Sequence, residues 1–298
     1  MHDFDFLEPT SVAEASRLLA ELGEDCRVIA GGTALMLGLR QRMLAPTHLV
    51  SLAGIDALRG LHFDPASGLR IGALVRHAEL AASPLVLRHY PVLAGMAQRM
   101  ANPQVRNQGT VGGNLCYADP STDPPGCLMA LDAQIVLASA RGERLLGIED
   151  FLVDYYATAL EGDEIVSEIR VPHMGEGDAR RRGVYTRFLR TAAEHRPLAS
   201  VALVARTANG ICRDARLVVG ASTPIPVRQR RAEDFLEGRA ITWAVAAEAG
   251  EIVAADIKPV SDLRGSADFR REMVRVNVRR TVAELFGLDL AQEQGALA

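Results

Sequence analysis

The segment RNQGTVGGNLCYADPSTDPP (residues 106–125) contains three glycines, two asparagines and two aspartates, and few side chains that could form a core. A second glycine pair occurs in AGGTA (30–34), and like TVGGN (110–114) it lies near an apolar run. Glycine allows positive φ and lets a ligand approach the backbone N–H groups closely. Successive N–H groups in such turns bind anions, and a following helix N-terminus adds partial positive charge. The two turns therefore favour a phosphate or pyrophosphate site built from neutral donors.

A lone Gly-Gly pair is more often a tight turn than a ligand site, so both interpretations stay open from these residues alone. Thr33, Thr110 and Asn114 could add side-chain hydrogen bonds, and Asp123 could accept one from a ribose hydroxyl or an adenine amine. The sequence contains no G-x-G-x-x-G and no P-loop lysine, so the Rossmann fingerprint and the Walker motif are absent. A dinucleotide would have to be bound in another way.

The composition narrows the class of protein. The 298 residues are 48% hydrophobic and carry a net charge of −4, which is typical of a globular protein and unlike a nucleic-acid-binding one. No secretory signal and no apolar run of about 20 residues is visible, so we expect a cytoplasmic protein without a membrane span. His77 and His195 are expected as surface or packing residues. The four cysteines form no C-x-x-C pair, which predicts reduced thiols and no metal site: Cys26, Cys116, Cys127 and Cys212.

Hydrophobic periodicity predicts alternating helices and strands around these turns. Residues 11–22 read as an amphipathic helix, with Ser11 and Glu14 at capping-box spacing and Gly23 at its end. The polar run 173–183 predicts an exposed loop and a domain boundary. The remaining expected strands are at 27–30, 48–52, 58–63, 68–74 and 164–172, with a hairpin at 198–207 and 211–221. The remaining expected helices are at 34–43, 76–83, 92–101, about 230–255 and 268–287, and residues 126–139 pass from a helix into a strand.

Four motifs in a fixed order resemble a known family. They are VIAGGTALM (28–36), ANPQVRNQGTVGGNLCYADPSTDPP (101–125), EIVSEIRVP (164–172) and PVSDLRGSADFRREMVRVNVRR (259–280). Together they resemble the FAD-binding medium subunit of the molybdenum hydroxylases, the family of xanthine dehydrogenase and carbon monoxide dehydrogenase. The resemblance covers about residues 3–287 and is specific to the family rather than to one member.

The resemblance implies an α+β fold with two parts. A two-subdomain FAD-binding fold of the vanillyl-alcohol-oxidase (PCMH) type would comprise residues 1–55 and 56–176. A C-terminal α+β domain at 177–288, a three-stranded antiparallel sheet with helices, would follow, with a tail at 289–298.

The resemblance also implies which residues meet FAD. The first turn would line the pyrophosphate and ribityl region, the second turn would form the other pyrophosphate wall, Asp123 would meet the adenosine end, and Val166 would pack near the isoalloxazine. Some relatives place a lysine near the flavin ring where this chain offers Arg187, and a surface arginine is the equal alternative there. The turn residues are Ile29, Ala30, Gly31, Gly32, Thr33, Ala34, Leu35, Thr110, Val111, Gly112, Gly113 and Asn114. No catalytic or metal-binding residue is expected.

The function implied is that of an electron-transfer subunit, an oxidoreductase component not expected to be active alone. A large partner would hold the molybdopterin cofactor, a small partner would hold two 2Fe–2S clusters, and FAD in this chain would pass electrons to an external acceptor. A dimer of such heterotrimers is expected. The alternative enzyme is a stand-alone FAD-dependent reductase of the enolpyruvyl-sugar reductase type, whose substrate arginines and proton donor we cannot place here. A non-enzymatic scaffold is the third possibility.

Overall fold

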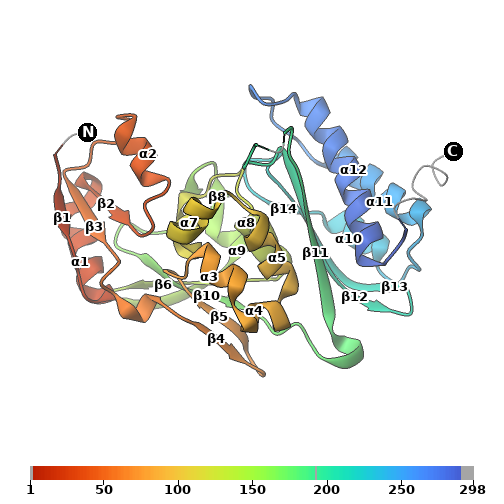
Figure 1. Ribbon diagram of the computed structural model, residues 1–298, viewed down its shortest axis with the longest axis horizontal. Coiled ribbons are helices and arrows are strands. Elements are labelled where there is room, and N and C mark those ends of the chain that lie inside the picture. The colour runs from red at the N-terminus through yellow and green to blue at the C-terminus, as the bar shows by residue number, and fades with distance from the viewer. Residues whose placement is uncertain (1–2, 192, 290–298) are drawn as a thin grey trace. The chain divides into compact units, whose positions relative to one another are not determined.

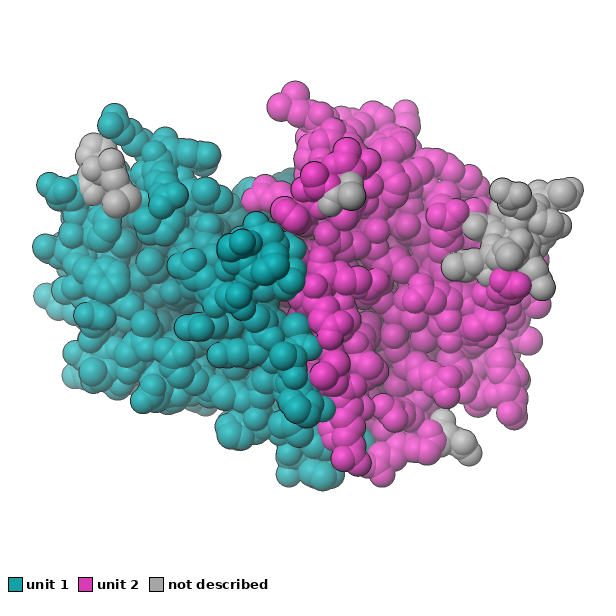
Figure 2. Space-filling view, viewed as in Figure 1, with its two compact units in different colours: residues 1–85, 101–119, 133–173 teal, residues 86–100, 120–132, 174–298 magenta. Residues whose placement is uncertain are grey.

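The computed structural model describes residues 3–191 and 193–289, and the predicted tail at 289–298 lies outside them apart from Asp289. The chain forms two compact units, each built from segments that are separate in sequence (Figure 2). The first unit comprises residues 1–85, 101–119 and 133–173, and the second comprises residues 86–100, 120–132 and 174–298. The glycine-rich turns therefore belong to the first unit, whereas Asp123 belongs to the second.

A small parallel sheet carries the first glycine turn. Its strand order is β1-β3-β2, and helix α1 packs on it through Ala15 and Leu19 beside Val50. The predicted helix at 11–22 is confirmed: the Ser11 hydroxyl accepts the Glu14 N–H, and Gly23 ends the helix at a φ of 54°. The elements are β1 (Asp5–Leu7), α1 (Val12–Leu22), β2 (Cys26–Ile29), α2 (Leu35–Arg40) and β3 (His48–Ser51).

An antiparallel sheet of five strands forms the rest of the first unit, in the order β4-β5-β10-β6-β7. The fully buried side chains of Ile71 and Ile169 pair across its centre, and β10 bulges between Val166 and Glu168. The strands are β4 (Leu61–Asp64), β5 (Gly68–Gly72), β6 (Gln134–Ser139), β7 (Gly142–Gly147) and β10 (Ile165–Val171). Around them lie α3 (His77–Ala82), α6 (Pro103–Gln108), α7 (Val111–Tyr117), α9 (Ile148–Phe151), β8 (Leu152–Asp154) and β9 (Ala157–Thr158), while α4 (Pro84–His89) has residues in both units.

The second unit is an antiparallel sheet with helices on both faces. Helices α10, α11 and α12 cover one face (Figure 1), where Val201 and Leu203 of β12 join a core with Val278 of α12. Helices α5 and α8 pack against the other face. The elements are α5 (Pro91–Arg99), α8 (Pro124–Ala130), β11 (Arg181–Phe188), β12 (Ala199–Ala208), β13 (Ile211–Gly220), β14 (Val227–Arg228), α10 (Arg230–Leu236), α11 (Trp243–Asp256) and α12 (Ala267–Leu285).

The C-terminal sheet corrects one expectation. It has four strands in the order β11-β12-β13-β14, where three were expected. The fourth strand, β14, is two residues long and follows Pro224 and Pro226, so it has too little alternation to be recognised in the sequence. In addition, β11 begins at Arg181, inside the run predicted as a loop. None of the described helices is both long and apolar enough to span a membrane.

Candidate functional site

The two glycine-rich turns meet in the first unit. A Cβ placed on Gly31 would lie 2.2 Å from the carbonyl oxygen of Gln108 and 2.8 Å from the Cα of Gly109. A Cβ on Gly109 would in turn lie 3.3 Å from the Oγ1 of Thr33. Contacts below 3 Å leave no room for a side chain, so only glycine at position 31 lets the two segments approach this closely.

The second turn is the start of a helix. Thr110 is the N-cap of α7, and its Oγ1 accepts the N–H of Gly113 at 3.1 Å. Gly112 lies against Ala73, the residue after β5, because a Cβ there would be 2.8 Å from the Ala73 carbonyl oxygen. The partial positive charge of a helix N-terminus adds to the anion-binding character of the turn. Its first N–H groups are used within the chain, because those of Val111, Gly112 and Gly113 donate to the Val75 carbonyl, the Ala73 carbonyl and the Thr110 hydroxyl.

Asn114 provides a direct test of whether these residues fit a polar ligand. Its Oδ1 is buried and has no hydrogen-bond partner within the described chain. A buried polar atom without a partner is costly, and nearly all such atoms in proteins are paired. Beside it, a Cβ on Gly113 would lie 3.7 Å from the Cβ of Ala30, an ordinary van der Waals contact, so the two turns are neighbours here. The unpartnered oxygen calls for a hydrogen-bond donor such as a hydroxyl, and the N-terminus of α7 favours negative charge, so the residues present fit a ligand that carries both.

His77 packs beside Gly109, the residue that precedes the second turn. Its side chain is buried, its backbone N–H donates to the Gly109 carbonyl at 3.1 Å, and its Nδ1 has no partner among the described residues. Burial lowers the pKa of His77 to about 4, so the imidazole is neutral near pH 7. The structure thus shows a packing histidine and not a surface one.

Val166 reaches the same region through α7. It is buried on β10 next to the bulge, and its backbone lies within hydrogen-bonding reach of the Cys116 thiol on α7. The structure therefore brings both glycine turns and Val166 together within one unit.

Asp123 and Arg187 come together in the second unit, with a third residue that the sequence analysis missed. The Asp123 Oδ1 accepts the Tyr185 hydroxyl at 2.7 Å, and Oδ2 accepts Nη1 of Arg187 at 3.1 Å. Tyr185 and Arg187 are two residues apart on β11, so both face the same side of the strand. The Arg187 side chain is only 9% exposed, which excludes a surface arginine.

The electrostatics of this group are those of a buried ion pair. Burial raises the pKa of Asp123, while the Arg187 guanidinium and the Tyr185 hydroxyl act in the opposite direction. Burial, together with the Asp123 carboxylate, raises the pKa of Tyr185 well above its ordinary value. Tyr185 is therefore a neutral hydrogen-bond donor to this carboxylate near pH 7. Its only signal in the sequence is the i, i+2 spacing to Arg187, which has meaning only once Asp123 is known to lie opposite.

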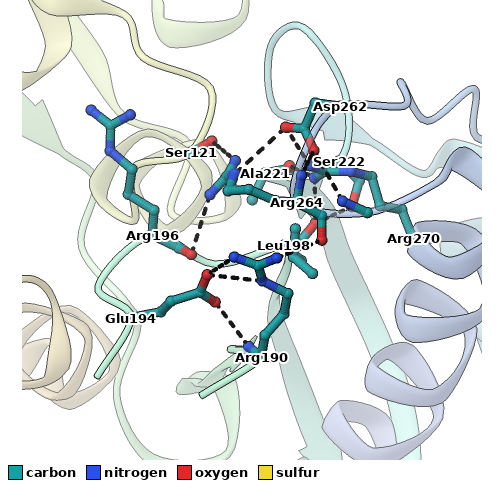
Figure 3. A network of polar contacts seen from close by, with 11 residues as sticks. Ser121, Arg190, Glu194, Arg196, Leu198, Ala221, Ser222, Asp262, Arg264 and Arg270 are labelled. Carbon is teal, nitrogen blue, oxygen red and sulfur yellow. Dashed lines mark hydrogen bonds and ion pairs between the residues drawn. The ribbon is translucent and has the colours of Figure 1, made fainter. Parts of the chain in front are cut away.

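The C-terminal motif holds the segment that carries Asp123 (Figure 3). Nη2 of Arg264 donates to the Ser121 Oγ at 2.7 Å. Arg270 is buried, donates to the Ala221 carbonyl at 2.8 Å, and forms an ion pair with Asp262 at 2.7 Å. These contacts fix the loop before α8, and with it the position of Asp123.

Comparisons with known proteins agree with this architecture. The family model for the FAD-binding domain in molybdopterin dehydrogenase matches residues 2–174, and the model for the CO dehydrogenase flavoprotein C-terminal domain matches residues 184–285. The fold and the site thus define an FAD-binding component of an oxidoreductase. More narrowly, the chain belongs to the FAD-binding medium subunits of the molybdenum hydroxylases, as its sequence motifs predicted.

Individual relatives match along nearly their whole length. The nicotine 6-hydroxylase medium subunit of Paenarthrobacter nicotinovorans is 33% identical over 279 residues, which cover 94% of this chain and 96% of the relative. The carbon monoxide dehydrogenase medium chain of Hydrogenophaga pseudoflava has the same identity and coverage. A structure of carbon monoxide dehydrogenase from H. pseudoflava, lacking the Mo-pyranopterin moiety of its molybdenum cofactor, superimposes with a TM-score of 0.91 at 33% identity, over 96% of this chain and 98% of that one. Quinoline 2-oxidoreductase from Pseudomonas putida 86 gives 0.89 at 29% identity, over 99% and 98%.

Proposed function

We propose that this chain takes electrons from 2Fe–2S clusters of a small partner subunit and passes them through its FAD to an external acceptor. The observation that carries the proposal is the junction of the two glycine turns beside the buried, unpartnered Oδ1 of Asn114. FAD, when bound, supplies the capacity to accept and release one or two electrons. The protein supplies binding, orientation and electrostatics around it.

The backbone N–H groups of the first turn would hold the pyrophosphate, the N-terminus of α7 would favour its charge at the second turn, and side chains of both turns would add contacts. Thr33 and Asn114 have the polar atoms for this, while Thr110 is already used to cap α7. Asp123 would meet the adenosine end. Its two oxygens already accept from Tyr185 and Arg187, but a carboxylate can accept about four hydrogen bonds, so it retains capacity. The proposed site consists of Ile29, Ala30, Gly31, Gly32, Thr33, Ala34, Leu35, Thr110, Val111, Gly112, Gly113, Asn114, Asp123, Val166 and Arg187.

The partners we propose are a large molybdopterin-binding subunit and a small 2Fe–2S subunit, assembled as a dimer of heterotrimers in the cytoplasm. The names of the relatives support a multi-subunit assembly, because they are called medium chains and subunits of dehydrogenase complexes. We also propose the domain limits 1–55, 56–176 and 177–288. The final electron acceptor and the oxidised substrate are properties of the assembled complex.

The test compares the chain alone with the chain in its native complex. The purified chain should bind one FAD non-covalently and oxidise no aromatic heterocycle or aldehyde alone. Purified from its native source, it should bring a large and a small subunit, and that complex should reduce its FAD when substrate is added. Substrate-dependent turnover by this chain with FAD as its only cofactor would overturn the proposal in favour of a stand-alone reductase. A folded chain that takes up no FAD would favour a scaffold.

A further inference from the structure

Strand β11 presents an open edge of the C-terminal sheet. It is the first strand in the order β11-β12-β13-β14, so only one of its sides is paired (Figure 1). In an antiparallel pair, residues alternate between pointing both backbone groups at the partner and pointing both away. The Arg181 N–H donates to the Met174 carbonyl, and the Tyr185 carbonyl accepts Nη2 of Arg99 at 2.7 Å, so both residues point away from β12. Gly183 lies between them and points outward as well.

A groove of about 420 Å³ runs beside this edge. Its apolar surface comes from Pro91 and Val92 of α5 and from Leu285 of α12. Its polar lining is strongly basic, because three consecutive arginines (180–182) are balanced by a single carboxylate, that of Glu284. Because the Arg181 N–H and the Tyr185 carbonyl are already bonded, the outward groups left for an added strand are those of Gly183 and the Tyr185 N–H. With the apolar contacts and positive charge of the groove, these are the features that an added strand of acidic character would use.

The two arginines that flank the edge face opposite sides of the sheet. Arg182 has the same parity as Val184, which packs into the core under α12, and Arg181 has the same parity as Tyr185, which faces Asp123 of the other layer. A strand laid along β11 alternates its side chains in the same way. Carboxylates on either face of that strand would therefore meet an arginine.

A second copy of this chain is a poor occupant of the groove. A second copy would bring a second run of arginines into the same basic groove, and like charges brought together destabilise a strand pair. Edge strands in natural proteins are usually short or covered, and β14, the other edge strand of this sheet, has only two residues.

We propose that the β11 edge docks an extended, acidic segment of a partner subunit by strand addition. This inference rests on the proposed function, because the occupant is a subunit of the same complex.

The first test is hydrogen exchange at single amides of β11. The native complex, purified with its partner subunits, is compared with the chain alone. Strand addition should slow exchange of the outward amides of Gly183 and Tyr185 by at least tenfold in the complex. Complex formation that leaves both amides unchanged would overturn the inference and leave the proposed function standing. Protection that appears in the isolated chain and grows with its concentration would overturn it too, since a second copy would then fill the edge.

The second test reverses the charge of the groove. The double variant Arg181→Glu/Arg182→Glu should weaken assembly with the partner subunits at least tenfold, whereas Arg17→Glu on the exposed face of α1 should leave it unchanged. FAD content and circular dichroism confirm that each variant is folded. Assembly of the double variant as tight as that of the wild type would contradict the inference. Failure of the wild-type chain to assemble with any partner would defeat the proposed function itself, and this inference with it.

Discussion

The glycine turns of the first unit and the Asp123 group of the second, the two parts of the proposed site, are built in opposite ways. The turns are built from backbone, and their geometry depends on side chains that are missing, as at Gly31. The Asp123 group is built from buried charged and polar side chains, with Tyr185 and Arg187 as its partners. Substitutions that add side-chain atoms should therefore disrupt the first region, and substitutions that remove charged or polar groups should disrupt the second. The difference teaches that one site can require two kinds of mutational test.

Glycines of the same turn also differ among themselves. Gly31 and Gly112 face protein backbone, so they are needed for the protein to pack against itself. Gly32 has a φ of 68°, which strains any other residue whether or not a ligand is present. A Cβ on Gly113 meets only the Thr110 Oγ1, at 2.8 Å, and the Ala30 Cβ at 3.7 Å. Gly113 is therefore the position at which ligand binding can best be separated from folding.

The largest effect is expected from Gly31→Ala. Its Cβ would overlap the Gln108 carbonyl oxygen at 2.2 Å, and because that atom is backbone, the two turns would have to separate. We expect a loss of more than about 4 kcal/mol in the free energy of unfolding, or no folded protein. Urea unfolding followed by circular dichroism measures it.

A matched control exists in α5. A Cβ on Gly95 has no heavy atom within 4 Å, so Gly95→Ala should keep or raise stability, by up to about 1 kcal/mol through helix propensity. If Gly31→Ala unfolds at the same urea concentration as Gly95→Ala, the close contact of the two turns is not real.

Asp123→Asn tests the second region by weakening a buried pair. Arg187 would keep its charge at 9% exposure without a carboxylate, and breaking such a pair costs about 3–4 kcal/mol. Thermal or urea unfolding measures the loss. Arg187→Gln in the same protein should restore part of the stability, because the unpaired charge is then gone. Purely additive losses in the double variant would mean that the two side chains do not interact.

Acid should destabilise the first region through His77. The folded protein keeps this imidazole neutral down to about pH 4, whereas the unfolded chain takes up a proton below about pH 6.5. The unfolded state therefore binds more protons in this window, and stability should fall as the pH drops from 6.5 to 4, by about 3 kcal/mol in total. Urea unfolding at several pH values measures the slope. His77→Phe keeps the ring and removes the titration, so it should flatten that slope; an identical slope would refute the assignment.

Local patterns in the sequence predicted the structural features that depend on residues close together in the chain. The α1 helix with its Ser11 cap and the two glycine turns were all visible there, and the family resemblance followed from such motifs. The pairing of Asp123 with Tyr185 was not visible, because it joins residues 62 positions apart. The sequence predicts a turn where the structure has α7, since Gly112 and Gly113 lower helix propensity, while the Thr110 cap and burial against Ala73 override them. Tertiary contacts determine both the Asp123–Tyr185 pair and the α7 helix, so neither could be predicted from local patterns.

The smallest effect, and the most specific to the cofactor, is expected from Gly113→Ala. The added methyl would lie at the junction of the two turns, 3.7 Å from the Ala30 Cβ, and its only contact below 3 Å is a side-chain oxygen, the Thr110 Oγ1. Loss of one hydrogen bond to a charged phosphate costs about 1.5–3 kcal/mol, so FAD affinity should fall by about one to two decades while the protein stays folded. Fluorescence of FAD released from the purified variant measures the flavin content.

Two further variants separate binding from capping in this last experiment. Thr110→Val removes the α7 cap and should cost about 1 kcal/mol in stability, so it shows how much flavin is lost when only the cap is lost. Gly126→Ala in α8, whose Cβ would lie 4.0 Å from Pro226, should change neither stability nor flavin by a measurable amount. Gly113→Ala should lose more flavin than Thr110→Val because it alone adds an atom at the junction of the turns, where the pyrophosphate would lie. A folded Gly113→Ala protein with full flavin would mean that the pyrophosphate is not held there. The backbone-built region would then be a packing junction, and the comparison with the Asp123 group would lose its functional meaning.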